Sequence, residues 1–158
     1  MSHTTITRRR RRAGSAALAL ALSITLLLAV GTTAAFASGG LRSQMLALTN
    51  QSRHAHREHS LRLDHGLSHS ARRHSRLMAR HGSLFHSSNV THYLHGKHWR
   101  SWGENVGESY ETNLASLQRA FMRSPDHRHN VLNRSYQRVG IGVTRRDGRV
   151  WVTLVFYG

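Results

Sequence analysis

Histidine is the residue type in this sequence that most plainly offers chemistry. The 158-residue chain has 14 histidines and no cysteine, so thiolate metal sites, disulfides and a cysteine nucleophile are excluded. Two groups have the spacing of metal ligands, His54-x-His56-x2-His59 and His92-x2-His95-x2-His98. Residues three apart share a face on a helix. Two interpretations stay open: a secondary transition-metal site or, more commonly, histidines that stand in for Lys and Arg on a solvated basic surface.

Serine is the remaining type of nucleophile. Ser87 and Ser88 directly follow His86, but residues adjacent in sequence rarely face each other in the geometry that general-base activation requires. Ser124 directly precedes Pro125, a place where a hydroxyl commonly hydrogen-bonds to backbone at a helix end. We therefore expect none of these serines to act as a nucleophile.

The first 37 residues have the pattern of an export signal. Residues 8–12 are five consecutive arginines, residues 16–30 are an apolar run, and Ala35-Phe36-Ala37 is an Ala-x-Ala motif. A basic segment, a short apolar segment and small residues before the cut are typical of a secretory signal peptide. The sequence predicts cleavage after Ala37, a secreted protein, and a short flexible start at residues 38–40. The alternative is an uncleaved segment that anchors the protein in the membrane.

The net charge of +16 is divided between this signal and the rest of the chain. Five of the 23 basic residues and none of the 7 acidic residues lie in the signal, so residues 38–158 keep a net charge of +11. For an exported protein, a specific nucleic acid is not the expected partner. The expected partners are anionic envelope polymers, lipid headgroups or glycans. The alternative is that the positive charge only keeps the protein soluble at the cell surface.

Helices are predicted where apolar residues recur every three or four positions. These segments are residues 41–57, 66–80 and 112–123, with one further helical turn at 127–132. Gly82 is a typical end for the second helix, and Thr112 or Asn113 is a suitable cap for the third. Residues 83–111 are rich in Ser, His, Gly and Asn and are expected to be irregular.

The strongest strand signal lies at the end of the chain. Residues 139–144 alternate apolar residues with Gly and Thr, Asp147-Gly148 is a typical hairpin turn, and residues 150–157 are mostly β-branched or aromatic. Because both faces of this last segment are apolar, it should be a central strand that is covered on both sides. A short extended piece is also expected at residues 61–63. Helices followed by a hairpin predict an α+β layered domain.

Three groups of motifs occur in an order that is typical of a known family. They are Leu41 to Arg53 with Leu61-x-Leu63-Asp64 and Phe85-His86-Ser87, then Trp102-Gly103-Glu104-Asn105-Val106-Gly107, then Ser124-Pro125-x-His127-Arg128-x-Asn130. Together they resemble the CAP superfamily (cysteine-rich secretory, antigen 5 and pathogenesis-related-1 proteins) over residues 41–158. Because it lacks cysteine, the chain is most similar to the bacterial, disulfide-free branch of this superfamily. The resemblance implies an α-β-α sandwich with three main helices, the C-terminal antiparallel hairpin in the central sheet, and a surface cleft.

The resemblance also implies a cleft that can hold a divalent metal. Matched motif to motif, it assigns His86 and His127 as the imidazole ligands and Glu104 as the carboxylate. Two neutral imidazoles and one carboxylate suit Zn²⁺ or another divalent metal, with water in the fourth position. The same three side chains could instead form a hydrogen-bonded network that fixes the cleft loops without metal.

The second glutamate of the family has no counterpart in the matching motif. Ser124 stands near its place, Asp126 replaces the usual Gly before His127, and Glu108 or Glu111 would have to supply the missing group in space. The remaining candidates for the cleft are Trp102, which suits a glycan or lipid chain, and two asparagines expected to brace the loops, Asn105 and Asn130.

The expected function is a secreted, monomeric binding module for a divalent metal, a lipid or a cell-envelope ligand, rather than an enzyme. One alternative is a metal-dependent hydrolase, in which the cleft metal activates a water that attacks an ester or an amide. A second alternative is a module that binds the envelope through charge alone and has a purely structural cleft.

Overall fold

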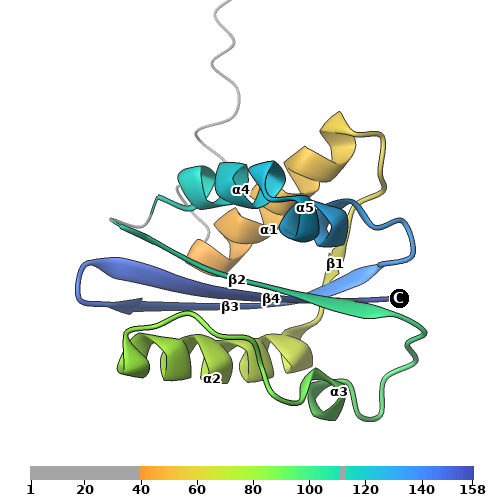
Figure 1. Cartoon of the computed structure of the whole chain (residues 1–158). Helices are drawn as coiled ribbons and strands as arrows, with labels where there is room; N and C mark the ends of the chain where they lie inside the picture. Colours follow the sequence, from red (N-terminus) through yellow and green to blue (C-terminus); the bar gives the residue numbers. More distant parts are fainter. Residues whose placement is uncertain (1–39, 111–112) are drawn as a thin grey trace, which may run out of the picture. The chain divides into compact units, whose positions relative to one another are not determined.

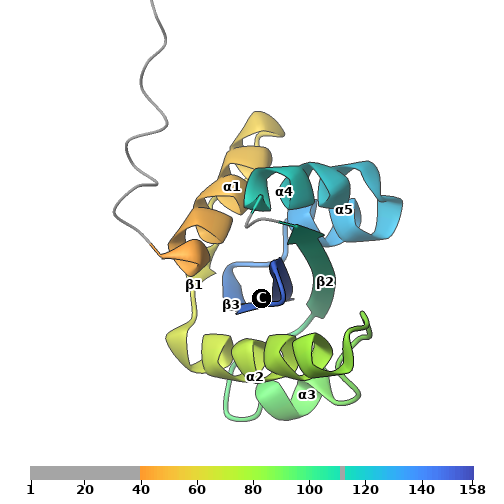
Figure 2. The ribbon, with the colours of Figure 1, turned by 90° about the vertical axis from the view of Figure 1, so that its left-hand side faces the viewer.

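A four-stranded sheet lies between two layers of helices in the computed structural model, which describes residues 40–110 and 113–158 (Figure 1). One layer contains α1 (Leu41–Ala55), α4 (Leu114–Arg123) and α5 (Pro125–Leu132), and the other contains α2 (His65–His81) and the short α3 (Val90–Tyr93). Figure 2 shows the same two layers end-on, above and below the strands. The α+β sandwich is as predicted. The predicted export signal and the alternative cap Thr112 lie outside the described residues.

The strand order in the sheet is β1-β3-β4-β2. The strands are β1 (Arg62–Leu63), β2 (Trp102–Tyr110), β3 (Arg138–Arg146) and β4 (Arg149–Tyr157). The predicted hairpin joins β3 to β4, and its turn residues Asp147 and Gly148 both have positive φ. The last strand is central, as predicted. The sheet has β2 at one edge and the two-residue β1, which pairs in parallel with β3, at the other.

The prediction of an irregular segment at residues 83–111 is wrong for its second half. Residues 102–110 form β2, which pairs antiparallel with β4 from Trp102 to Tyr110. Apolar alternation does not reveal this strand, because its buried run from Gly103 to Gly107 consists of Gly, Glu and Asn around a single Val106. These polar side chains find their partners in distant segments, which a local pattern does not show.

Apolar side chains fill both faces of the sheet. Leu114, Phe121, Ile141 and Leu154 are buried in the cluster beneath α1, α4 and α5, and Trp151 is buried on the face of α2. The contact of α2 with β3 is close, because a Cβ placed on Gly142 would lie 2.2 Å from a backbone carbon of Ala71. Within the described part of the chain, no helix is both long enough and apolar enough to span a membrane.

Candidate functional site

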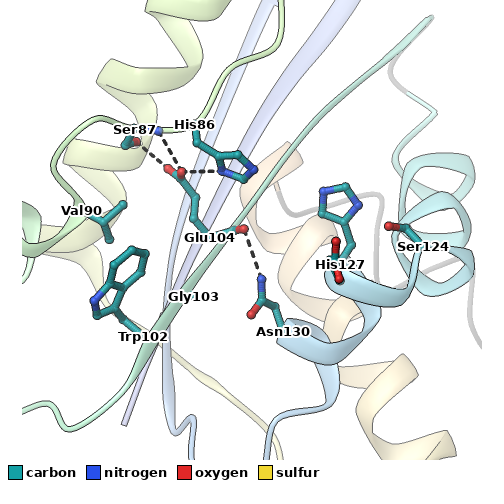
Figure 3. Close-up of a pocket in the computed structure, with 10 residues that line it drawn as sticks. His86, Ser87, Val90, Trp102, Gly103, Glu104, Ser124, His127 and Asn130 are labelled. Atoms are coloured by element: carbon teal, nitrogen blue, oxygen red, sulfur yellow. Dashed lines mark hydrogen bonds and ion pairs between the residues drawn. The ribbon is translucent and has the colours of Figure 1, made fainter.

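A cavity of about 500 Å³ opens at the β2 edge of the sheet. Its lining includes every predicted site residue except Asn105: His86, Trp102, Glu104, Ser124, Asp126, His127 and Asn130. Ser87, Val90 and Gly103 complete the lining. These side chains come from the loop after α2, from α3, from β2 and from the α4–α5 region (Figure 3). We call this cavity the β2-edge cleft.

Glu104 is the buried anchor of the β2-edge cleft. It is 6% exposed, and its Oε2 accepts hydrogen bonds from His86 Nδ1 and from the backbone N–H of Ser87, both at 2.9 Å. Its Oε1 accepts a bond from Ser87 Oγ at 2.5 Å. A buried carboxylate is stable when donors satisfy both of its oxygens. Glu104 therefore fixes the loop that carries His86, whose side chain is 61% exposed.

Residues from both helical layers line the β2-edge cleft, on either side of the edge strand β2. Glu104 and Val106 lie on the same face of β2, and Val106 packs against Met78 of α2. His127 belongs to α5 in the opposite layer. Because β2 has no neighbouring strand on its outer side, groups from both layers can meet there. Figure 3 shows His86 and His127 on opposite sides of the cleft.

Two asparagines tie α5 to β2. Asn105 Nδ2 donates to the carbonyl of His127 at 3.0 Å, and Asn130 Nδ2 donates to Asn105 Oδ1 at 2.9 Å. The contact between β2 and α5 is close, because a Cβ placed on Gly103 would lie 2.3 Å from Asn130 Oδ1. The backbone position of His127 is therefore set by side chains of the strand that carries Glu104.

His127 is electrostatically disposed to stay neutral. Burial first, and the proximity of His86 second, lower the pKa of His127, and Asp126 partly opposes them. Its ring also packs against Phe121, with ring centroids 5.1 Å apart. A neutral imidazole keeps a lone pair that can accept a hydrogen bond or coordinate a metal.

The sequence predicts His86, Glu104 and His127 as a metal set, and this stays a prediction. Across residues 40–110 and 113–158, no three His, Asp or Glu side chains are grouped so that they could hold a metal ion. Both oxygens of Glu104 are already engaged by His86 and Ser87. What remains is a pair of imidazoles, one of them oriented by a carboxylate as metal-binding histidines commonly are. A cation there would need further donors from water or from a ligand.

Glu108 does not replace the missing second glutamate. Both of its oxygens accept hydrogen bonds from Arg149 Nη1 at 3.0 Å, and it does not line the cleft. Residues four apart on a strand lie roughly 13 Å apart, so Glu108 is too far along β2 from Glu104. Glu111 lies outside the described residues.

Comparison with known proteins identifies the family. A family model described as CAP, the cysteine-rich secretory protein family, matches residues 46–156. The chain belongs to this family. No curated protein matches the chain.

Solved bacterial structures share this CAP fold. An extracellular protein of Bacillus anthracis with an SCP domain is 27% identical with a TM-score of 0.65, covering 75% of this chain and 40% of that one. A cysteine-rich secretory protein of Staphylococcus aureus is 23% identical with a TM-score of 0.61, covering 74% and 38%. An outer surface protein of Borrelia burgdorferi is 15% identical with a TM-score of 0.64, covering 74% and 91%. This chain thus spans about two fifths of the first two proteins.

Sequence reasoning missed the role of Ser87 in this CAP domain. Its Oγ donates to Glu104 rather than pairing with a histidine, so it positions the carboxylate. The Phe85-His86-Ser87 motif was the available signal. The spaced histidines are not brought together as ligands: His54 Nε2 bonds to Ser60 Oγ at 2.6 Å, while His59 Nε2 donates to a backbone carbonyl at 2.9 Å.

Proposed function

We propose that this is an exported CAP-domain protein whose β2-edge cleft binds a ligand without transforming it. The export pattern of residues 1–37 supports secretion, with membrane anchoring through an uncleaved segment as the alternative. The related Bacillus anthracis protein is described as extracellular. In this proposal the protein acts as a monomer at the cell exterior.

One observation carries the binding proposal: Glu104 and Ser87 hold His86 in place facing His127 across an open cavity. Two fixed imidazoles can bind a divalent cation or hydrogen-bond a polar ligand. Trp102, which is 40% exposed at the cleft, offers an amphipathic ring for a glycan or a lipid chain. A divalent cation such as Zn²⁺, with its remaining positions filled by water or by the ligand, is therefore one proposed occupant, and an envelope glycan or lipid is the other.

The arrangement favours binding over catalysis. The hydroxyl of Ser87 donates to Glu104, so it lacks the histidine partner that activates a serine nucleophile. Both oxygens of Glu104 accept hydrogen bonds from His86 and Ser87, so the carboxylate serves to position that loop. A metal-dependent hydrolase would need a metal that the two imidazoles bind and that carries a reactive water. This alternative replaces the binding proposal only if substrate turnover is measured.

The test is a calorimetric titration of the full chain, purified without an affinity tag, with Zn²⁺. His86→Ala and His127→Ala should each weaken binding by at least about tenfold. His129→Ala is the matched control, because His129 is exposed on the same helix as His127 and does not line the cleft. Zinc binding that is unchanged in both cleft variants would refute cation binding there. Hydrolysis of peptides, esters or glycans above the rate of these variants would replace the binding proposal with the hydrolase alternative.

A further inference from the structure

A second groove lies at the other edge of the sheet, away from the β2-edge cleft. It has a volume of about 700 Å³ and lies between the start of α1, residues 65–76 of α2 and the second half of β3. β1 pairs with β3 only at Arg138 and Val139, so the later residues of β3 have no strand beside them on this side. Figure 2 shows α1 above and α2 below this edge. We call it the basic groove.

The basic groove is lined by arginines without carboxylate partners. Arg42, Arg72, Arg76 and Arg145 all line it, together with His65. Among the described residues that line it, none is acidic, and none of the four arginines forms an ion pair within the described part of the chain. Residues 1–39 contain no Asp or Glu, so the N-terminal segment cannot neutralise them either.

None of the acidic residues that the structure describes lines the basic groove. In the described residues, Glu58 pairs with Arg134, Asp64 with Lys97, Glu104 with His86, Glu108 with Arg149 and Asp147 with Arg146, while Asp126 lines the β2-edge cleft. Clustered guanidinium groups repel one another unless an anion lies between them. The charge distribution therefore leaves this groove strongly positive.

Two buried polar atoms of the groove residues have no partner among the described residues. They are Arg42 Nε and Thr144 Oγ1. A buried polar atom without a hydrogen bond is destabilising, so each is a group that a ligand oxygen or an ordered water would satisfy. The same groove contains the first turn of α1, which has no acidic residue, and its free backbone N–H groups add positive potential.

The basic groove continues along α2 into a second depression. That depression shares Arg76, Thr144 and Arg145 with the groove and extends it to Arg80 and Arg146. Asp147 also lines it and pairs with Arg146, so Arg76, Arg80 and Arg145 are the arginines there without an ion pair among the described residues. Arg72, Arg76 and Arg80 are four residues apart on α2, so they follow one another along a single helix face. Opposite them, residues 144–146 of β3 supply two further arginines. The cations thus form a track, which suits an extended anion better than a single small one.

We propose that the basic groove binds a linear phosphodiester polymer that carries no bases, such as a polyol-phosphate chain. Guanidinium groups suit phosphate because they donate two parallel hydrogen bonds in a fixed plane. Proteins that hold single-stranded nucleic acid add aromatic side chains on which bases stack. Among the described residues, no Phe, Tyr or Trp lines either part of the track. The site is separate from the cleft and does not depend on the proposed function.

The test measures the binding of a fluorescent glycerol-phosphate oligomer to the untagged full chain by anisotropy at several salt concentrations. The triple variant Arg72→Gln/Arg76→Gln/Arg145→Gln should lose at least about tenfold in affinity, and the slope of log K against log salt should fall by about 2. Arg119→Gln/Arg123→Gln/Arg134→Gln is the control with the same charge change. Its residues are exposed and lie outside both the cleft and the groove, so it should lose much less.

Thr144→Val distinguishes a specific binding site from nonspecific electrostatic attraction, because it leaves the net charge unchanged. It should weaken binding several-fold, because it removes a hydroxyl that is available to a phosphate oxygen. His86→Ala should leave oligomer binding unchanged, which keeps this test apart from that of the cleft. Equal losses in the two triple variants would overturn the proposal, as would no effect of Thr144→Val. Binding of inorganic phosphate as tight as that of the oligomer would refute a polymer site, and tighter binding of a thymidine oligonucleotide of equal charge would assign the groove to nucleic acid.

Discussion

Glu104 and His86 lie 18 positions apart in sequence, yet Glu104 Oε2 and His86 Nδ1 are joined by a 2.9 Å hydrogen bond. The carboxylate is buried on an edge strand, whereas the imidazole belongs to a loop and is largely exposed. The buried partner thus orients the exposed one. The other ring nitrogen of His86 stays available to the β2-edge cleft, where His127 lies on the opposite side.

Replacing Glu104 should therefore affect both stability and the cleft. Glu104→Gln removes the charge that strengthens three hydrogen bonds, so unfolding should become easier by about 1–3 kcal/mol. Affinity for Zn²⁺, if the cleft binds it, should drop by ~10–100-fold because His86 loses its orientation. Urea denaturation and calorimetry measure the two effects. Glu108→Gln, on the same strand but paired with Arg149, should leave zinc affinity unchanged.

Glycine at position 103 is required by the contact between β2 and α5. In Gly103→Ala the new methyl group would lie 2.3 Å from Asn130 Oδ1 and 2.7 Å from the hydroxyl of Tyr136. Displacing these groups should cost about 1–3 kcal/mol of stability, seen as a lower urea midpoint. Gly66→Ala is the control: its Cβ would have 3.5 Å to the nearest atom, and alanine favours the helix there. An unchanged midpoint for Gly103→Ala would contradict this packing.

Asp64 should make the protein sensitive to acid. Burial alone would raise its pKa, but hydrogen bonds from Leu67 N–H, Lys97 and Tyr157 outweigh burial and lower the pKa from 3.8 to about 2. Because the folded pKa is the lower one, this stabilisation is complete above the unfolded pKa and is lost as pH falls from about 4 to about 2. Asp64→Asn should remove about 2 kcal/mol at neutral pH.

The measurement for Asp64 is the free energy of unfolding as a function of pH. The curve of Asp64→Asn should be flatter than that of the parent between about pH 4 and pH 2, because this one titration is absent. Asp147→Asn is a suitable control, since the side chain of Asp147 is 84% exposed in the hairpin turn. Parallel curves for Asp64→Asn and the parent would show that the Asp64 cluster does not act this way.

Arg53 should be a strong determinant of stability. Its side chain is fully buried and donates to the carbonyls of His59, Val131 and Asn133 at 2.7–3.0 Å. Arg53→Met leaves these carbonyls without their donor, so it should destabilise the protein by about 3 kcal/mol or more. The melting temperature measures this effect. Arg57→Met, in the turn after α1 and exposed, should change it little, and an equal shift in both variants would refute this role of Arg53.

Local patterns were sufficient for the elements with an apolar face. The helix at 66–80 was predicted because its apolar residues repeat at helical spacing, and the structure has it at His65–His81. The final strand was predicted as central, and β4 lies between β3 and β2. In both cases burial of one continuous apolar surface determines the structure, and that surface is visible in consecutive residues.

Local patterns failed where burial is polar. Residues 102–110 were expected to be irregular, but Glu104 and Asn105 are buried because Ser87, His86 and the backbone of His127 satisfy their oxygen and nitrogen atoms. Glu108 was a candidate for the cleft, but Arg149 on the neighbouring strand holds it. Whether a polar residue is buried depends on partners far away in sequence, so only the tertiary structure shows it.

The sequence by itself determined the family, the order of most elements and which residues could gather in a cleft, because ordered motifs and apolar periodicity are local properties of a chain. The tertiary structure decided how those residues meet. It placed β2 at the sheet edge, engaged both oxygens of Glu104, and set His86 and His127 on opposite sides of the cleft. It also gathered arginines from α1, α2 and β3 at the opposite edge. Distances between side chains from separate elements follow from packing, which a linear pattern does not contain.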